Sequence, residues 1–188
     1  MALIDRVKNI LLTPRTEWPA IAAEPATTQS LYVGYVMILA AIGPVAMAVR
    51  GGILGTTVAL LGYAISLGIT FVLALIVDAL APTFGGEKNF LQSLKLVAYS
   101  YTAAWVAGIF HLLPFLGGLI GLLAAIYAFY TFYLGVPVMK KCPEDKAVAY
   151  TIVVAICGLV LGGVVVGALM SVIVGGGMMG ALGIGMMR

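Results

Sequence analysis

Charged residues are absent from four long stretches of this chain, and these stretches predict where it crosses a membrane. The uncharged stretches are residues 31–49, 51–77, 96–139 and 147–187. A helix rises about 1.5 Å per residue, so about 20 apolar residues cross a hydrocarbon core that is about 30 Å thick. The first two stretches are therefore each predicted to hold one transmembrane helix.

The third stretch is about twice as long as one crossing requires. It contains the segment His111-Leu-Leu-Pro114-Phe-Leu-Gly117-Gly118, in which proline and glycine favour a break between two helices. The first part of the fourth stretch has the length of one further helix. We therefore expect an all-α membrane protein in which residues 31–174 form one five-transmembrane-helix bundle, with spans at about 31–49, 53–80, 91–112, 115–139 and 148–174.

Residues 175–188 are rich in glycine and methionine. As a helix, residues 175–187 would extend only about 20 Å, which is too short for a crossing. Glycine also weakens a helix by about 1 kcal/mol relative to alanine. We expect this segment to be a flexible apolar tail rather than a sixth helix.

The composition excludes a water-soluble globule. Of the 188 residues, 63% are hydrophobic and 9% are charged, and the mean hydropathy is +1.15, whereas soluble domains carry about 25% charged residues. The sequence contains no Walker loop, no G-x-S-x-G or H-E-x-x-H motif and no Cys/His ligand cluster. We expect a membrane protein that is not an enzyme and has no cofactor.

The distribution of lysine and arginine predicts the orientation of the bundle. Most basic residues lie in the N-terminal segment and in the connections that follow the second and fourth predicted helices, whereas the opposite side carries only Arg50 and Arg188. Basic residues favour the cytoplasmic side of a membrane. The N-terminus is therefore predicted to be cytoplasmic and the C-terminus to lie outside.

Residues 1–30 are predicted to form a cytosolic arm with a short amphipathic helix. Ile4, Val7 and Leu11 lie on one helical stripe, and charged residues occupy the other face. Such a helix can lie in the headgroup plane, and Trp18 has the type of ring that prefers this interface. The arm either anchors the N-terminus or docks a partner.

Polar side chains within the predicted helices are candidates for a substrate or ion path. Asp78 lies near the inner end of the second helix and could bind a cation or a proton, facing Lys95 at the start of the third; alternatively, it is an interfacial carboxylate that fixes the depth of its helix. Several hydroxyls could line a hydrated path or simply join neighbouring helices. These hydroxyls belong to Ser66, Thr70, Tyr99, Tyr101 and Tyr130.

A metal site is a separate hypothesis for the outer side of the bundle. His111 lies near the outer turn between the third and fourth predicted helices, and Met178 and Met179 lie in the tail. Thioether sulfurs are soft ligands that suit Cu(I). The alternative is that His111 is a polar turn residue and that the methionines fill gaps in apolar packing.

Several short motifs occur in a consistent order along the chain. They are Thr13-Pro14-x-x-x-Trp18 before the first helix, Asp78 followed by Gly85-Gly86 and Phe90, and Tyr99-Ser-Tyr101 in the third helix. In this arrangement the chain resembles the Yip1-domain family over about residues 8–175, specifically its bacterial branch of small five-span inner-membrane proteins. The resemblance implies a bacterial inner membrane. The Asp-Leu-Tyr-Gly-Pro motif of the eukaryotic branch is absent, so a partnership with Rab GTPases is not implied.

These observations leave two functional hypotheses. In the first, the bundle binds or transports a cation or small solute along the path described above. In the second, the protein is a non-catalytic membrane scaffold or adaptor that organises lipids or recruits partners through the arm and through a loop containing Lys140 and Lys141. Two offset glycine pairs in the fifth predicted helix favour close helix packing, within the chain or in a homo-oligomer. The lipid bilayer is the expected partner, and nucleic acid is not, because the basic residues flank membrane helices.

Overall fold

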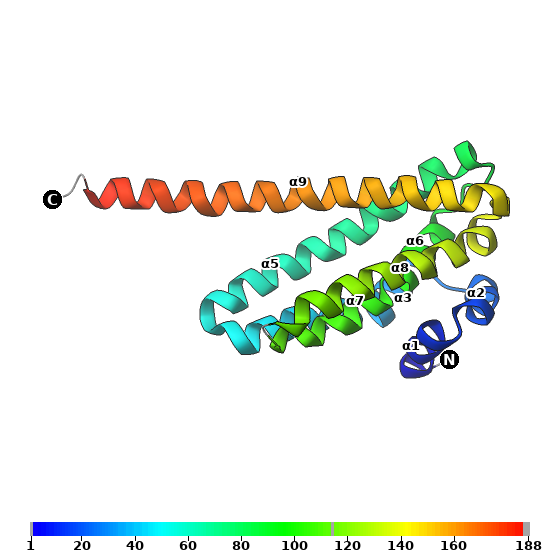
Figure 1. Cartoon of the computed structure of the whole chain (residues 1–188), viewed down its shortest axis with the longest axis horizontal. Coiled ribbons are helices and arrows are strands. Elements are labelled where there is room, and N and C mark those ends of the chain that lie inside the picture. The colour runs from blue at the N-terminus through cyan, green and yellow to red at the C-terminus, as the bar shows by residue number, and fades with distance from the viewer. Residues whose placement is uncertain (1, 114, 186–188) are drawn as a thin grey trace.

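The protein was analysed as a computed structural model, which is an all-α bundle (Figure 1). The structure describes the backbone of residues 2–113 and 115–185, and the side chains of these residues except Leu54, residues 169–170 and residues 172–185. Among the described residues, four helices are long and apolar enough to cross a membrane. They are Thr28–Ile53, Gly55–Phe84, Leu116–Lys140 and Glu144–Ala168.

The first two of these helices form a hairpin. The first begins with α3 (Thr28–Leu31), continues through the π-helical η1 (Tyr32–Val36) and α4 (Met37–Ala40), and runs into α5 (Ile42–Leu80). The side chains of Thr27 and Ser30 cap its start reciprocally, with hydrogen bonds of 2.9 and 3.0 Å. Within α5 the chain turns at Gly52, whose φ of 58° and ψ of −146° are accessible to glycine but not to residues with a side chain. The predicted break between the first two helices is thus confirmed at this position.

The third predicted helix is interrupted. Residues 90–112 form α6 (Phe90–Ser100), α7 (Thr102–Ala107) and the 3₁₀-helical η3 (Gly108–Leu112). The segment is not among the four helices that are long and apolar enough to cross a membrane. The segment nevertheless runs along the bundle. Near its start, Gln92 and Ser93 contact α2 and α8. Near its other end, Gly108 lies against Gly43, and a Cβ on Gly108 would stand 2.8 Å from the Gly43 Cα.

The last two helices are α8 (Leu116–Lys140) and α9 (Glu144–Gly185). The expectation of a non-helical tail is wrong for residues 175–185, because α9 continues through them and extends past the other helices in Figure 1. Residues 186–188 lie outside the described part of the chain. The expectation treated residues 175–187 as a separate helix, whereas residues 175–185 continue a helix that is already formed. Each added residue then gains a backbone hydrogen bond without a new nucleation cost.

The apolar side chains of the bundle point mainly outward. Many leucines and isoleucines on α8 are half exposed or more, among them Leu119, Leu122, Leu123 and Ile126. The buried core is concentrated toward the end where α2, α6 and α8 meet, and includes Trp18, Leu94 and Val136. An apolar outer surface around a compact core is the arrangement expected for a bundle solvated by lipid.

Two short helices precede the bundle, α1 (Leu3–Leu12) and α2 (Pro14–Ala23). A helix is confirmed where the amphipathic pattern predicts it. Pro14 starts α2 at a position where its missing N–H is not needed. Figure 1 places α1 and α2 at one end of the bundle, beside the chain's N-terminus. Both pack against the protein itself, α1 on α2 and α7, and α2 on α8.

Candidate functional site

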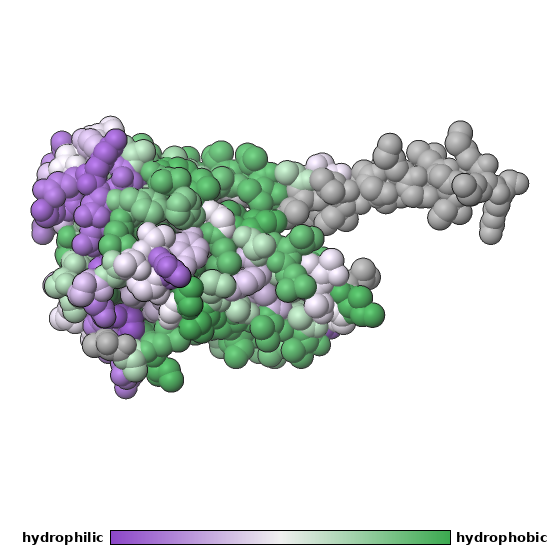
Figure 2. Space-filling view, turned by 180° about the vertical axis from the view of Figure 1, so that it is seen from behind, coloured by the Kyte–Doolittle hydropathy of each residue, from purple (hydrophilic) through white to green (hydrophobic). Residues whose placement is uncertain are grey.

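Hydrophilic residues gather at one end of the molecule. Figure 2 shows this end at the left in purple, and the apolar surface in green beside it. We refer to it as the charged end; it comprises α1, α2, the connection 81–89 and the turn 141–143. The predicted site residues Asp78, Lys95 and Lys140 lie here, and their contacts define two polar clusters.

The first cluster joins α5, α6 and α8 around one carboxylate. The Asp78 Oδ1 atom accepts hydrogen bonds from the backbone N–H of Asn89 (2.7 Å), the hydroxyl of Ser93 (3.0 Å) and the Nζ of Lys140 (2.8 Å). Lys140 Nζ also donates to the Asn89 carbonyl at 3.2 Å and to the Ser93 hydroxyl at 2.7 Å. The Lys140 side chain is fully buried and that of Asp78 is 19% exposed. Asp78 and Lys140 thus neutralise each other in this buried cluster, and the three N–H groups of the Lys140 ammonium all have acceptors.

The backbone of the connection 81–89 positions this cluster. Gly85 has a φ of 76°, which favours glycine, and a Cβ on Gly86 would lie 2.9 Å from the Lys140 carbonyl oxygen. That carbonyl instead accepts the N–H of Glu87 at 2.8 Å. The connection thus lies directly against the end of α8. An exposed pair between Lys141 and Glu87, at 2.8 Å, joins the same two segments on the surface.

The expected pairing of Asp78 with Lys95 is wrong. Lys95 Nζ donates instead to the carbonyls of Ile21, at 2.8 Å, and Glu24, at 2.6 Å. These carbonyls lie at the C-terminal end of α2, where the helix dipole favours a cation. Lys95 is only 2% exposed, so it holds α2 on the bundle rather than facing the Asp78 carboxylate.

The second cluster lies under the arm. Arg6 forms ion pairs with Glu17 and Glu24 of the α2 segment, and its guanidinium lies 5.8 Å from the centre of the Tyr99 ring. Arg6 is one of the charged residues on the face of α1 that was expected to be polar, yet it is only 6% exposed. The partners on α2 explain this, because a buried guanidinium requires compensating charge. Arg6 and Lys95 both line a cavity of about 230 Å³ between α1, η1 and α6.

Trp18 fastens α2 to α8. Its side chain is fully buried, and its ring nitrogen donates to the Thr131 carbonyl at 3.1 Å. The ring fills the space left by Gly135, where a Cβ would lie 2.6 Å from the Trp18 ring. The expectation that Trp18 sits at the lipid interface is therefore wrong: glycine on α8 provides a protein pocket that the ring fills, and a protein carbonyl satisfies its N–H.

The residues predicted to contact partners divide into buried and exposed ones. Ile4 is 78% exposed, Val7 and Leu11 pack partly against the core, and Lys141 is exposed. Lys140 does not belong to an exposed loop, since it ends α8 and is buried in the first cluster. Only Ile4 and Lys141 of this set thus present most of their side chain to the surroundings.

The predicted hydroxyls do not converge on one cavity. Ser66 and Thr70 donate to the carbonyls of Tyr63 and Ser66, on their own helix, each at 2.8 Å. Tyr99 packs on the Tyr35 ring, with 4.4 Å between the ring centres. Tyr101 packs beside Trp105 and lines a cavity together with Ser100 and Thr151. Tyr130 is 43% exposed and lies beside Tyr127.

A family comparison adds to this geometry. The family model of the Yip1 domain matches residues 8–166. The chain belongs to the Yip1 domain family. Searches of curated proteins and of solved structures found no match. The predicted resemblance is thus confirmed at the level of the family, and the matched residues include both polar clusters except Arg6.

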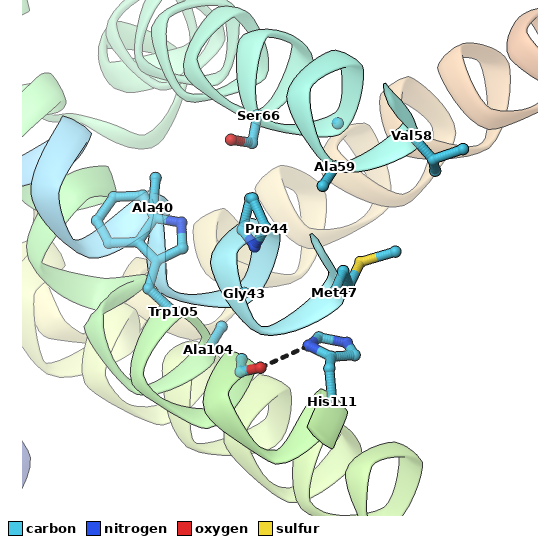
Figure 3. Close-up of a pocket in the computed structure, with 12 residues that line it drawn as sticks. Ala40, Gly43, Pro44, Met47, Val58, Ala59, Ser66, Ala104, Trp105 and His111 are labelled. Atoms are coloured by element: carbon cyan, nitrogen blue, oxygen red, sulfur yellow. Dashed lines mark hydrogen bonds between the residues drawn. The ribbon is translucent and has the colours of Figure 1, made fainter. Parts of the chain in front are cut away.

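The far end of this Yip1 domain contains the residue proposed for metal binding. Figure 3 shows His111 beside a cavity of about 290 Å³, with Ser66 and Trp105 on its other walls. A ring nitrogen of His111 lies 2.7 Å from the Gly108 carbonyl oxygen. Among the described residues, no three His, Cys, Asp or Glu side chains form a group that could hold a metal ion. The side chains of Met178 and Met179 lie outside the described part, so a site that includes them stays a prediction.

Sequence reasoning missed several residues of the two polar clusters. Glu17 and Glu24 were not selected, although they are acids on the segment that follows a helix carrying Arg6. Asn89 and Ser93 were also missed, and the signal for them was available: Asn89 precedes α6 as its N-cap, and Ser93 lies one helical turn later.

Proposed function

We propose that this protein is a non-catalytic membrane scaffold or adaptor of the Yip1 domain family, which presents its charged end to a partner. The carrying observation is that the arm is built into the bundle while one of its faces stays open. Arg6, Ile10 and Trp18 are buried against the protein. On the outer side of α1, Ile4 and Leu12 are 78% and 69% exposed, and exposed Lys8 lies between them on the same stripe.

The proposal includes five crossings, with residues 90–112 as the third. In support, Ser93 and Lys95 lie at the charged end, while the carbonyl of His111 accepts a hydrogen bond of 3.2 Å from Arg50, near the Gly52 turn. The segment therefore extends between the two ends of the bundle, which supports a third crossing.

We place the charged end in the cytoplasm and the opposite turns outside, in a bacterial inner membrane. The support is the concentration of lysine and arginine at the charged end, which the positive-inside rule assigns to the cytoplasm. The arm and the turn 141–143 then face the same compartment. In this orientation the stripe of Ile4, Lys8 and Leu12 is available to cytoplasmic proteins at the membrane surface.

The geometry favours a scaffold over a transporter. A carboxylate that binds a mobile cation needs free oxygen lone pairs and an accessible path. The Asp78 carboxylate is neutralised by the buried Lys140 ammonium, which already occupies the place of a cation, and its Oδ1 atom accepts three hydrogen bonds within the protein. Ser66 and Thr70 are engaged with their own helix, which is a structural use of a hydroxyl in an apolar surrounding.

The test is recruitment through the open face of α1. The variant Ile4→Ser/Leu12→Ser removes both exposed apolar side chains and leaves Arg6 and Trp18 in place, unlike a deletion of the arm. Ile53→Ser is the matched control, since Ile53 is 89% exposed near the opposite turn. Proteins cross-linked to each variant in native membranes are quantified by mass spectrometry.

We expect specific partners to be lost from the α1 variant and kept by Ile53→Ser, with equal thermal stability of the two purified proteins. Equal recovery of partners from both variants would contradict the role of this face. In a parallel measurement on proteoliposomes, a cation flux that Asp78→Asn abolishes would favour transport instead.

A further inference from the structure

A cavity of about 220 Å³ lies between α5, α6, α7, α8 and α9, away from both polar clusters. Its walls are mainly alanine, phenylalanine and branched aliphatic side chains, with Gly158 of α9 on one side. No charged residue is among the described residues that line it. Pockets for small apolar molecules have this character, with a few polar groups that fix the orientation of the ligand.

The polar groups of this cavity are hydroxyls, and one of them is unsatisfied. Ser100 lines the cavity at the end of α6 and is 2% exposed, and its Oγ has no hydrogen-bond partner among the described residues. Thr151 also lines the cavity, but donates to the Ala147 carbonyl of its own helix at 2.8 Å. A buried hydroxyl without a partner is costly, and the cost is removed when a ligand supplies a hydrogen-bond acceptor.

The depth of Ser100 restricts what such a ligand can be. Ser100 lies ten residues after Phe90, the first residue of α6, which corresponds to about 15 Å along a helix. Ser93 belongs to the polar cluster at the charged end, and Ser100 lies seven residues, or about 10 Å, further along the helix, which is inside a core about 30 Å thick. The ester groups of a phospholipid lie at the edge of that core, and bringing them to Ser100 would draw a charged headgroup into hydrocarbon at high cost.

We propose that this cavity binds a neutral, membrane-dissolved lipid that lacks a charged headgroup and carries a carbonyl oxygen, which accepts a hydrogen bond from Ser100. Part of one hydrocarbon chain of the ligand occupies the alanine-lined space beside Gly158, and the remainder stays in the bilayer. Such a ligand reaches the cavity from the bilayer and requires no aqueous path. The site is separate from the open face of α1, so either one can fail without the other.

The probe is diacylglycerol with a diazirine in one acyl chain, bound to the full-length protein in nanodiscs and cross-linked by light. Labelled peptides are identified by mass spectrometry. We expect labels on the cavity-lining parts of α8 and α9, displaced by unlabelled diacylglycerol and not by phosphatidylcholine with the same acyl chains. Displacement by phosphatidylcholine at the same concentration would overturn the proposal, because the cavity would then hold ordinary lipid chains.

Two variants test the residues. Gly158→Leu places a side chain in the cavity and should abolish labelling there, whereas Gly163→Leu, which has open space around it on the same helix, should not. Ser100→Ala removes the unsatisfied hydroxyl without adding volume and should weaken binding about 3- to 10-fold, since a hydrogen bond contributes on that scale.

The same Ser100→Ala substitution also distinguishes binding from a structural role. It should leave the thermal stability of the ligand-free protein unchanged or raised, because it removes an unpaired polar group. A loss of stability together with unchanged affinity for diacylglycerol would assign Ser100 to the fold and refute the site. Equal labelling of the Gly158→Leu and Gly163→Leu variants would refute it as well.

Discussion

The arm docks on the bundle because Gly135 has no side chain and leaves room for the Trp18 ring. The substitution Gly135→Ala, which adds one methyl group, tests this. A Cβ at Gly135 would lie 2.5 Å from the Leu96 Cδ1 atom and 2.6 Å from the Trp18 ring. Leu96 ends in a flexible side chain, but the Trp18 ring is rigid and is held by its hydrogen bond to Thr131. Gly135→Ala therefore forces α2 away from α8.

The magnitude follows from a matched comparison within α8. Gly121 lies in the same helix, and a Cβ there would meet no described atom within 4 Å. Both Gly→Ala changes gain the same helix propensity, about 1 kcal/mol in aqueous hosts. Overpacking at Gly135 costs about 1–3 kcal/mol. We expect the free energy of unfolding of Gly135→Ala to be about 1–3 kcal/mol lower than that of Gly121→Ala. Gly121→Ala should be at least as stable as the unmodified protein.

The assay is reversible unfolding in mixed micelles, monitored by tryptophan fluorescence, with trypsin cleavage at Arg15 as a probe of the arm. Gly135→Ala should lower the free energy of unfolding and accelerate the cleavage. Combining it with Trp18→Phe, which shortens the ring, should recover most of the overpacking cost and give a favourable coupling energy. Equal stabilities for the two alanine variants, or no coupling with Trp18→Phe, would refute this description of the arm.

Two further predictions concern the charged end. Lys140→Met leaves the Asp78 carboxylate without its partner and should lower the free energy of unfolding by about 3–5 kcal/mol. The double variant Lys140→Met/Asp78→Asn should recover much of this loss. A double variant as unstable as Lys140→Met alone would contradict the pairing. Burial raises the pKa of the Cys142 thiol, which is 4% exposed and lies 3.2 Å from the Phe84 carbonyl oxygen. Maleimide labelling of Cys142 should therefore be slower in the folded protein than in the unfolded one, and equal rates in a Cys157→Ala background would exclude this burial. The unfolded thiol ionises near pH 8.5. The free energy of unfolding should therefore decline as the pH rises above about 8.5, because the unfolded thiol then loses its proton more readily than the folded one.

The helical elements could be predicted from the sequence because a chain with so many apolar residues is placed in lipid, where a helix satisfies its own backbone groups. The charge at Arg50 predicted the break between the first two helices, and the chain turns two residues later at Gly52, where glycine allows the backbone angles. The limits of the interrupted third helix were harder to predict. The change of helix geometry at Tyr101 lies in the run Tyr99-Ser-Tyr-Thr102, which contains no proline or glycine, and there the Thr102 hydroxyl donates to the Tyr99 carbonyl at 2.7 Å.

The candidate site was predicted in its residues more than in its contacts. Asp78, Lys95 and Lys140 could be selected because charge near hydrocarbon is costly, but this cost does not determine which partner each charge finds. Asp78 and Lys140 are 62 positions apart, and Lys95 reaches carbonyls on α2 that no pattern identifies as acceptors. Such pairings depend on how helices are placed in three dimensions, which periodicity does not specify.

The same charges indicate how a partner would have to bind. If the arm left the bundle, the buried Lys95 ammonium would lose the Ile21 and Glu24 carbonyls, and Trp18 would leave an apolar pocket beside Gly135. Each change exposes groups whose native partners are inside the protein, so release has a high cost. A partner that recognises α1 would then act on the arm as it is docked, through Ile4 and Leu12, and would leave the buried cluster unchanged. The arm is in this respect a fixed surface, with its position set by the bundle, rather than a segment that opens to expose a hidden one.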